Sequence, residues 1–130
     1  MKIIRSEAIT IFYLENDFCI DMSDWNPAAY QLFQRKKDLL GITDNNRPHH
    51  SIYGSFTRNW PNFKRWVCLN RHGKTCAITR PWRNMVEFHL TRSMFSLAHH
   101  SRDLSDDRFS KLMESMRPAF IALSSAWKRD

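Results

Sequence analysis

The residues in this chain that suit metal binding or acid–base chemistry are its histidines and cysteines. Cys68, His72 and Cys76 follow one another at steps of four, which offers metal-ligand types without the paired Cys-x2-Cys spacing of zinc sites. Buried free thiols are the simpler interpretation of these cysteines. We therefore expect no metal and no cofactor. All the histidines lie in one part of the chain, and they are His49, His50, His72, His89, His99 and His100.

That part of the chain, residues 47–102, also holds the positive charge. It carries ten Lys and Arg against one acid, Glu87, whereas the flanking segments are close to balance within a net charge of +7. A charge excess confined to one segment favours a polyanionic partner, although it also suits a surface that only confers solubility. Histidines add positive charge on mild acidification.

Aromatic residues are interleaved with these cations. Cations neutralise phosphates and aromatic faces stack on bases, so the mixture is typical of a nucleic-acid-binding surface. We expect single-stranded DNA or RNA, because no helix-turn-helix pattern is present. The candidate nucleic-acid-binding residues are Arg65, Arg71, His72, Lys74, Arg80, Arg83, Arg92, Trp60 and Trp82.

Three apolar runs in this segment read as strands of an antiparallel β-meander: 63–69, 74–80 and 84–91. Gly73 would form the first turn because glycine adopts positive φ without cost. Such a sheet would carry the cations toward one common side.

Helices are predicted at 28–40 and at 103–128, and further strands at 8–14 and 51–56. Ser105 suits the N-cap of the last helix, and Pro118 is expected to kink or divide it. The chain would thus be a single α+β domain over residues 1–130, with an antiparallel meander packed on one side by an N-terminal and a long C-terminal helix.

The C-terminal helix carries a broad apolar stripe. We expect it to cover the meander; its alternative use is a homodimer interface. No apolar run approaches a membrane span, and three cysteines suit a reducing compartment, so the prediction is a cytoplasmic protein without a membrane partner. The members of the stripe are Phe109, Leu112, Met113, Met116, Phe120, Leu123 and Trp127.

An enzyme is the less favoured reading. The predicted order of a helix followed by a meander resembles the small RelE-type ribonuclease toxins, which implies RNA cleavage by His72, His89 and Arg83, with Arg80 and Tyr53 nearby. The elements His49-His50-Ser51 and His89-Leu90-Thr91 each resemble the His-x-Ser/Thr element of two-histidine phosphoesterases, but the chain has no matching halves.

A protein-interaction module is the remaining alternative. An inhibitor, adaptor or immunity-type protein would use the same basic segment to dock an acidic partner, with charge complementarity setting the association rate and the specificity.

Overall fold

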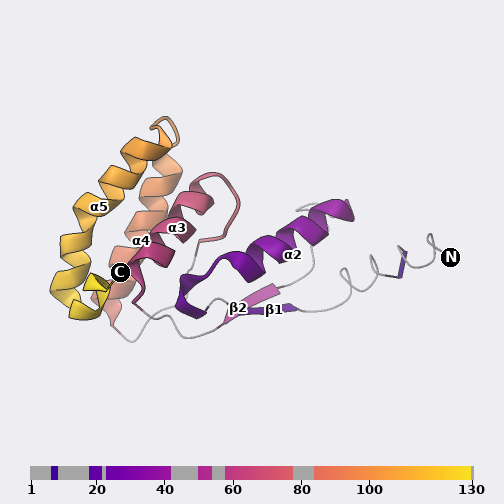
Figure 1. Ribbon diagram of the computed structural model, residues 1–130, viewed down its shortest axis with the longest axis horizontal. Helices are drawn as coiled ribbons and strands as arrows, with labels where there is room; N and C mark the ends of the chain where they lie inside the picture. Colours follow the sequence, from indigo (N-terminus) through magenta and orange to yellow (C-terminus); the bar gives the residue numbers. More distant parts are fainter. Residues whose placement is uncertain are drawn as a thin grey trace.

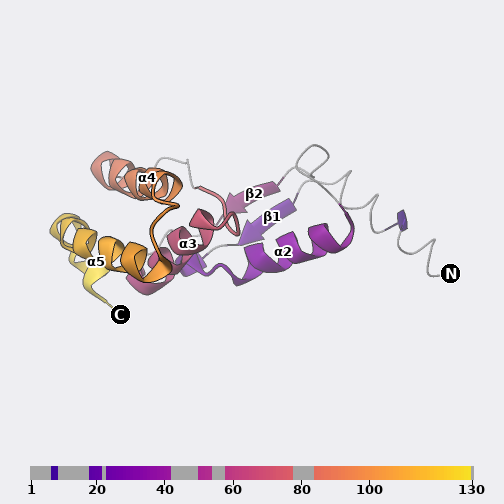
Figure 2. The same cartoon turned by 90° about the horizontal axis from the view of Figure 1, so that it is seen from above.

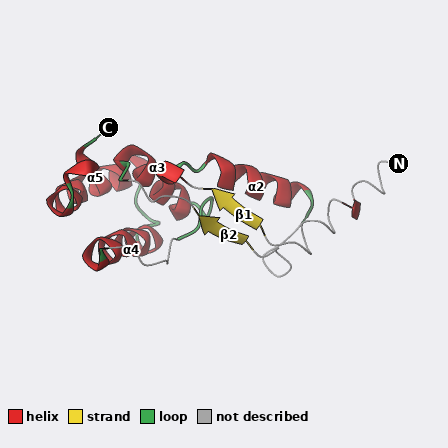
Figure 3. Cartoon of the chain, turned by 90° about the horizontal axis from the view of Figure 1, so that it is seen from below, coloured by secondary structure: helices red, strands yellow, loops and turns green. Residues whose placement is uncertain are grey.

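The computed structural model describes residues 7–8, 18–21, 23–41, 50–53, 58–77 and 84–129, and its elements are predominantly helical (Figures 1 and 3). In chain order they are β1 (Phe18–Asp21), η1 (Ser23–Trp25), α2 (Ala28–Leu39), β2 (His50–Tyr53), α3 (Trp60–Arg71), α4 (Met85–His100), α5 (Asp106–Leu123) and η2 (Ser125–Lys128).

The helices α3, α4 and α5 form a bundle in which each packs against the other two. Figures 1 and 2 show this bundle at one end of the molecule, with α2 and the two strands at the other. The short helix η1 packs on α3, so it joins the bundle to the rest of the chain.

The predicted antiparallel meander is wrong. Residues 63–69 lie inside α3, residues 84–91 begin α4, and residues 74–77 are not a strand. The strands that the structure describes, β1 and β2, pair in parallel with Phe18 opposite His50 and Asp21 opposite Tyr53. The α+β class is thereby replaced by a helical bundle, and residues 78–80 of the meander lie outside the described residues.

Asparagine caps explain why these runs are helical. The Asn59 side-chain oxygen accepts a hydrogen bond from the Asn62 N–H at 3.1 Å, and Pro61 fits the first turn of α3. Asn84 caps α4 in the same way, accepting from the Val86 and Glu87 N–H groups at 3.0 and 3.2 Å. Once α4 has begun, its buried positions recur at helical spacing through to Ala98.

The core of the bundle is aromatic, and Phe63 lies at its centre. Its ring packs at 4.8 Å from Trp25 of η1, 6.2 Å from Phe95 of α4 and 5.5 Å from both Phe120 and Trp127. Edge and tilted geometries of this kind are the ones that aromatic pairs prefer. A single side chain of α3 therefore contacts rings from elements that precede α3 and from elements that follow it in the sequence.

Helix α5 begins where the sequence indicated. Ser105 is its N-cap and its hydroxyl accepts from the Arg108 N–H at 3.3 Å. Pro118 was expected to kink or divide the helix, and it lies within one continuous helix, so the division is excluded. The apolar stripe packs into the core of the same chain, against helices rather than a meander, since Phe109, Met113 and Phe120 are fully buried.

Helix α2 and the N-terminal predictions have mixed outcomes. The helix predicted at 28–40 is present as α2; Tyr30 and Phe33 are buried, Gly41 follows the helix at φ +70°, and Leu39 is exposed. The strand predicted at 51–56 corresponds in part to β2, with 54–56 outside the described residues. Of the strand predicted at 8–14, only residue 8 is described, and it is helical.

Candidate nucleic-acid interface

The exposed side of α4 gathers basic residues at helical spacing. We call His89, Arg92, His99 and His100 the α4 basic face; all four are exposed, and they follow one another at steps of three, seven and one. The opposite side of the helix is buried in the bundle, from Phe88 to Ala98. Two exposed apolar residues, Met85 and Val86, precede this face in the first turn.

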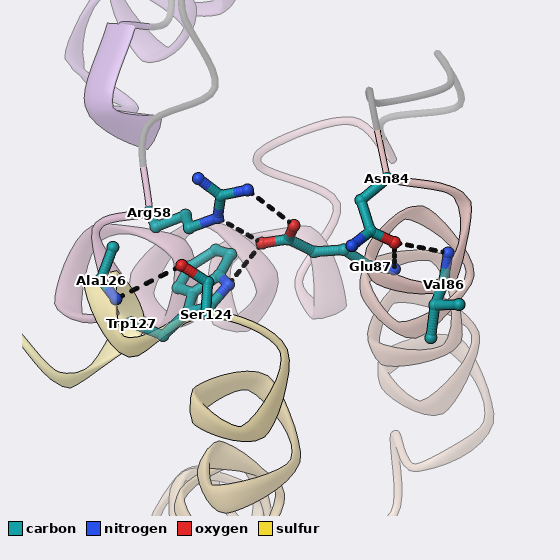
Figure 4. Close-up of polar contacts among 7 residues, drawn as sticks. All are labelled: Arg58, Asn84, Val86, Glu87, Ser124, Ala126 and Trp127. Carbon is teal, nitrogen blue, oxygen red and sulfur yellow. Dashed lines mark hydrogen bonds and ion pairs between the residues drawn. The ribbon is translucent and has the colours of Figure 1, made fainter.

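The one acid of α4, Glu87, is turned inward and neutralised. Its carboxylate accepts two hydrogen bonds from the Arg58 guanidinium, Nε to Oε1 at 2.7 Å and Nη2 to Oε2 at 3.0 Å (Figure 4). The Trp127 indole Nε1–H donates to Oε1 at 2.6 Å. The Glu87 side chain is 1% exposed and that of Arg58 is 39% exposed. A paired Arg–carboxylate bridge of this geometry is the strongest kind that side chains form.

The burial of Glu87 decides the charge of the α4 surface. Glu87 is also the only acid in residues 47–102. With its carboxylate inside the bundle, no acidic side chain of α4 reaches solvent. The α4 basic face is therefore uninterrupted by negative charge along the whole helix.

Arg71 has a structural position. Its guanidinium is buried and donates to the Ser101 carbonyl at 3.1 Å, the Arg102 carbonyl at 3.3 Å and the Asp106 carboxylate at 3.1 Å. It also lies 5.0 Å from the centre of the Phe109 ring. Arg71 thus ties the end of α3 to the turn between α4 and α5, and little of its charge faces solvent.

His72 shares the carboxylate that Arg71 uses. Its ring Nε2 lies 2.6 Å from Asp106 Oδ1, at an exposed site. An acid from the C-terminal segment therefore contacts two of the side chains that the sequence assigned to a binding surface.

Trp60 cannot stack on a base, because its ring is 1% exposed. Its indole N–H donates to Glu114 Oε1 at 3.0 Å, which belongs to α5. Trp66 is equally buried and donates to the Cys76 carbonyl at 2.8 Å. Both rings are part of the core.

The remaining described residues of the predicted set lie on different segments. Arg65 is exposed on α3, Lys74 is exposed in the segment that follows α3, and Arg92 is exposed on α4. Arg80, Trp82 and Arg83 lie outside the described residues.

The cysteines make no metal site in the described part of the chain, where no three metal-ligating side chains come together. Cys68 and Cys76 are free, half-buried thiols. Burial raises the pKa of the Cys68 thiol, with the Lys64 charge acting in the opposite direction, so this sulfur is held in its neutral form.

The ribonuclease reading loses its architectural basis with the meander. His72 follows α3 and is held by Asp106, whereas His89 lies on the outer side of α4. The third residue of that set, Arg83, lies outside the described residues.

A second feature of the bundle is a pocket between α3 and α5, which we call the α3–α5 pocket. Its volume is about 250 Å³. On its wall, Lys64 Nζ donates to Glu114 Oε1 at 2.9 Å, and the Arg117 guanidinium lies 5.8 Å from the centre of the Trp60 ring. It is lined by Trp60, Pro61, Lys64, Arg65, Cys68, Glu114 and Arg117.

Neither the α4 basic face nor the Arg58–Glu87 pair was identified from the sequence. His99 and His100 were noted only as part of a charge count, because the helix that aligns them with Arg92 was not recognised. The available signal was the spacing of 89, 92, 96 and 99, which is helical. The pairing of Arg58 with Glu87 carries no local signal.

The described helices include none that is both long and apolar enough to cross a lipid bilayer. Comparison of the chain with protein-family models, curated proteins and solved structures finds no match.

Proposed function

We propose that this protein binds nucleic acid in the cytoplasm through phosphate contacts made by the α4 basic face. The observation that carries the proposal is the inward burial of Glu87, which leaves an exposed helix face with Arg and His and no carboxylate. Arg92 supplies a permanent charge at its middle, and Arg102 adds a second just beyond its end.

Phosphate contacts made by a few cations position a nucleic acid without reading its sequence. The buried rings of Trp60 and Trp66 cannot stack on bases, which weakens the argument for a single strand, while Trp82 lies outside the described residues. We therefore expect binding that depends on backbone charge and discriminates little between sequences.

Charge reversal at Arg92 tests the proposal. Fluorescence anisotropy would follow a labelled 20-nucleotide strand, and the matching duplex, at low salt. Arg92→Glu should weaken binding at least about tenfold, because a repulsive charge replaces a phosphate contact at the centre of the face. Raising the salt from about 50 to 200 mM should weaken wild-type binding steeply as well.

Arg108→Glu is the matched control. Arg108 is also exposed and loses the same charge, but it lies on α5, where an acid in the first turn is tolerated. It should change the affinity less than about threefold, the effect of net charge alone. Equal losses in the two variants, or no binding by the wild type at low salt, would refute the proposal.

An acidic protein partner is the second candidate, favoured by exposed Met85 and Val86 beside the basic face. Interfaces combine apolar contacts with a charged rim more often than phosphate-binding surfaces do. If this candidate holds, Met85→Ser with Val86→Ser should abolish a stoichiometric, nuclease-resistant complex while leaving oligonucleotide affinity unchanged. Loss of oligonucleotide affinity in the same double variant would count against it.

A further inference from the structure

We propose that the α3–α5 pocket binds a small organic anion that carries one flat apolar group, such as an aryl phosphate or aryl carboxylate. This site is separate from the α4 basic face, and the inference does not depend on nucleic-acid binding. It rests on the size of the pocket, its apolar wall and its unequal charge.

The size of the pocket admits a ring with a head group. A cavity of roughly 150 Å³ is enough to hold benzene. The α3–α5 pocket, at about 250 Å³, has room for one ring and an attached anionic group. Pro61 and the neutral thiol of Cys68 contribute the carbon and sulfur surface against which a ring would pack, over the buried Trp60. Apolar walls with a few polar groups are typical of ligand sites.

The charges of the pocket favour an anion. Lys64, Arg65 and Arg117 line it against one acid, Glu114. The indole N–H of Trp60, followed by Lys64, donates to Glu114 and lowers the pKa of that carboxyl, so it is ionised at neutral pH. Glu114 therefore already has its donors, and Lys64 is its ion-pair partner.

The Arg117 guanidinium donates to the backbone carbonyls of Trp127, Lys128 and Arg129, so Arg65 is the cation left to meet a ligand. It is exposed, it lines the pocket, and the described residues include no hydrogen-bond or ion-pair partner for it. A guanidinium presents a planar set of donors that matches a phosphate or carboxylate in two-point contact. We assign Arg65 to the anionic head group and the wall of Pro61 and Cys68 to the ring.

Phenyl phosphate is the probe for the test, with inorganic phosphate and phenol as its two halves. Binding would be followed by ¹H–¹⁵N NMR, reading the indole N–H of Trp60 and the backbone amide of Arg65. Phenyl phosphate should shift both signals and bind at least about tenfold more tightly than either half, because only it uses the wall and the cation together.

Arg65→Gln should weaken phenyl phosphate binding by about tenfold or more, the typical effect of losing a charge-assisted contact. Arg108→Gln on α5 is the matched control, because Arg108 is an exposed arginine outside the pocket, and it should leave the binding unchanged. Cys68→Leu should block binding by filling the pocket. A well-dispersed, native-like ¹H–¹⁵N spectrum would show that this variant is folded.

The inference is overturned if phenyl phosphate shifts neither signal at millimolar concentration. It is also overturned if inorganic phosphate binds as well as phenyl phosphate, or if Arg65→Gln and Arg108→Gln behave alike. Because oligonucleotide binding is tested at Arg92 and the pocket at Arg65, failure of one proposal is distinguishable from failure of the other.

Discussion

At the scale of the residue, the Glu87 carboxylate has two side-chain partners: Arg58, which is partly exposed to solvent, and Trp127, which is buried. Arg58 is 39% exposed, whereas the Trp127 indole that donates to the same carboxylate is buried. Burying a charge is tolerated when its hydrogen bonds are complete, and removing one partner leaves the other charge uncompensated. Substitution of Arg58 and substitution of Glu87 should therefore lower the free energy of unfolding by different amounts.

We expect Arg58→Met to lower the free energy of unfolding by about 3 kcal/mol, because it leaves a charge in the bundle with the indole alone. Glu87→Gln should cost only about 1–2 kcal/mol, since water can reach Arg58 and the amide oxygen still accepts from Trp127. Urea denaturation of both variants measures the difference.

The double variant completes this test. Arg58→Met with Glu87→Gln should cost less than the sum of the single variants, as expected for groups in contact. Asp107→Asn, which breaks the exposed Asp107–Lys111 pair at 3.1 Å, is the control and should change stability by less than about 0.5 kcal/mol. Additive costs at Arg58 and Glu87 would contradict the coupling.

At the scale of the element, Pro118 is the residue least suited to its position. It lies in α5 between Arg117 and Ala119 and is exposed, so its ring makes little packing contact to offset the missing N–H. The helix continues through it to Leu123 because the stripe on the opposite side, including Phe120, is anchored in the core.

Pro118→Ala should raise the free energy of unfolding by about 1–2 kcal/mol. The gain from a restored helix hydrogen bond exceeds the loss of proline's rigidity in the unfolded chain. Thermal unfolding followed by circular dichroism measures it. Pro118→Gly, which restores the N–H but adds backbone freedom, should fall about 1 kcal/mol below Ala. An alanine variant less stable than the natural chain would show that proline is accommodated without strain.

The ends of α2 and α5 could be predicted from the sequence, whereas the choice between helix and strand for the central segments could not. Ser105 and Gly41 act through their neighbours in the chain, so their roles in α5 and after α2 could be inferred from sequence. Within 63–69, the four residues 66–69 form a continuous apolar run, a pattern that suits both a covered strand and a buried helix. Asn59 and Asn84 resolve the ambiguity, since each supplies an N-cap.

The candidate site was harder to predict than the helices. The inward orientation of Arg71 depends on its contact with Asp106, 35 residues away. The charge of the exposed side of α4 depends on Arg58, which holds Glu87 inside the bundle from 29 residues earlier in the chain. Such partners are chosen by the packing of the bundle. The location of the positive charge within 47–102 could be predicted, but which cations face solvent could not.

At the scale of the whole molecule, one aromatic cluster joins the described elements of the bundle into a cooperative unit. Phe63 touches rings from η1, α4, α5 and η2, and all of these are buried. Because the core is closely packed, a cavity at its centre would remove packing contacts from every element around it.

Phe63→Ala should lower the free energy of unfolding by about 3–5 kcal/mol, the usual cost of emptying a ring-sized volume in a core. Phe63→Leu should cost less, because much of the volume is kept. Urea unfolding by tryptophan fluorescence and by far-UV circular dichroism should give coincident transitions.

Leu39→Ala is the control for Phe63, since Leu39 is 87% exposed on α2. Its change should stay within about 0.5 kcal/mol. A loss below about 1 kcal/mol for Phe63→Ala, or two separate transitions in the natural chain, would contradict a single cooperative core.

The position of Trp127 under the first turn of α4 also constrains how the chain matures on the ribosome. Translation delivers residues from the N-terminus onward, and the indole that completes the Glu87 site arrives 40 residues after the carboxylate. Phe63 likewise waits for Phe120 and Trp127 before its surroundings are complete. A nascent chain with α3 and α4 already outside the exit tunnel would still present an open core. The bundle is therefore expected to close only after Trp127 has left the exit tunnel, and until then its aromatic surface is open to chaperones.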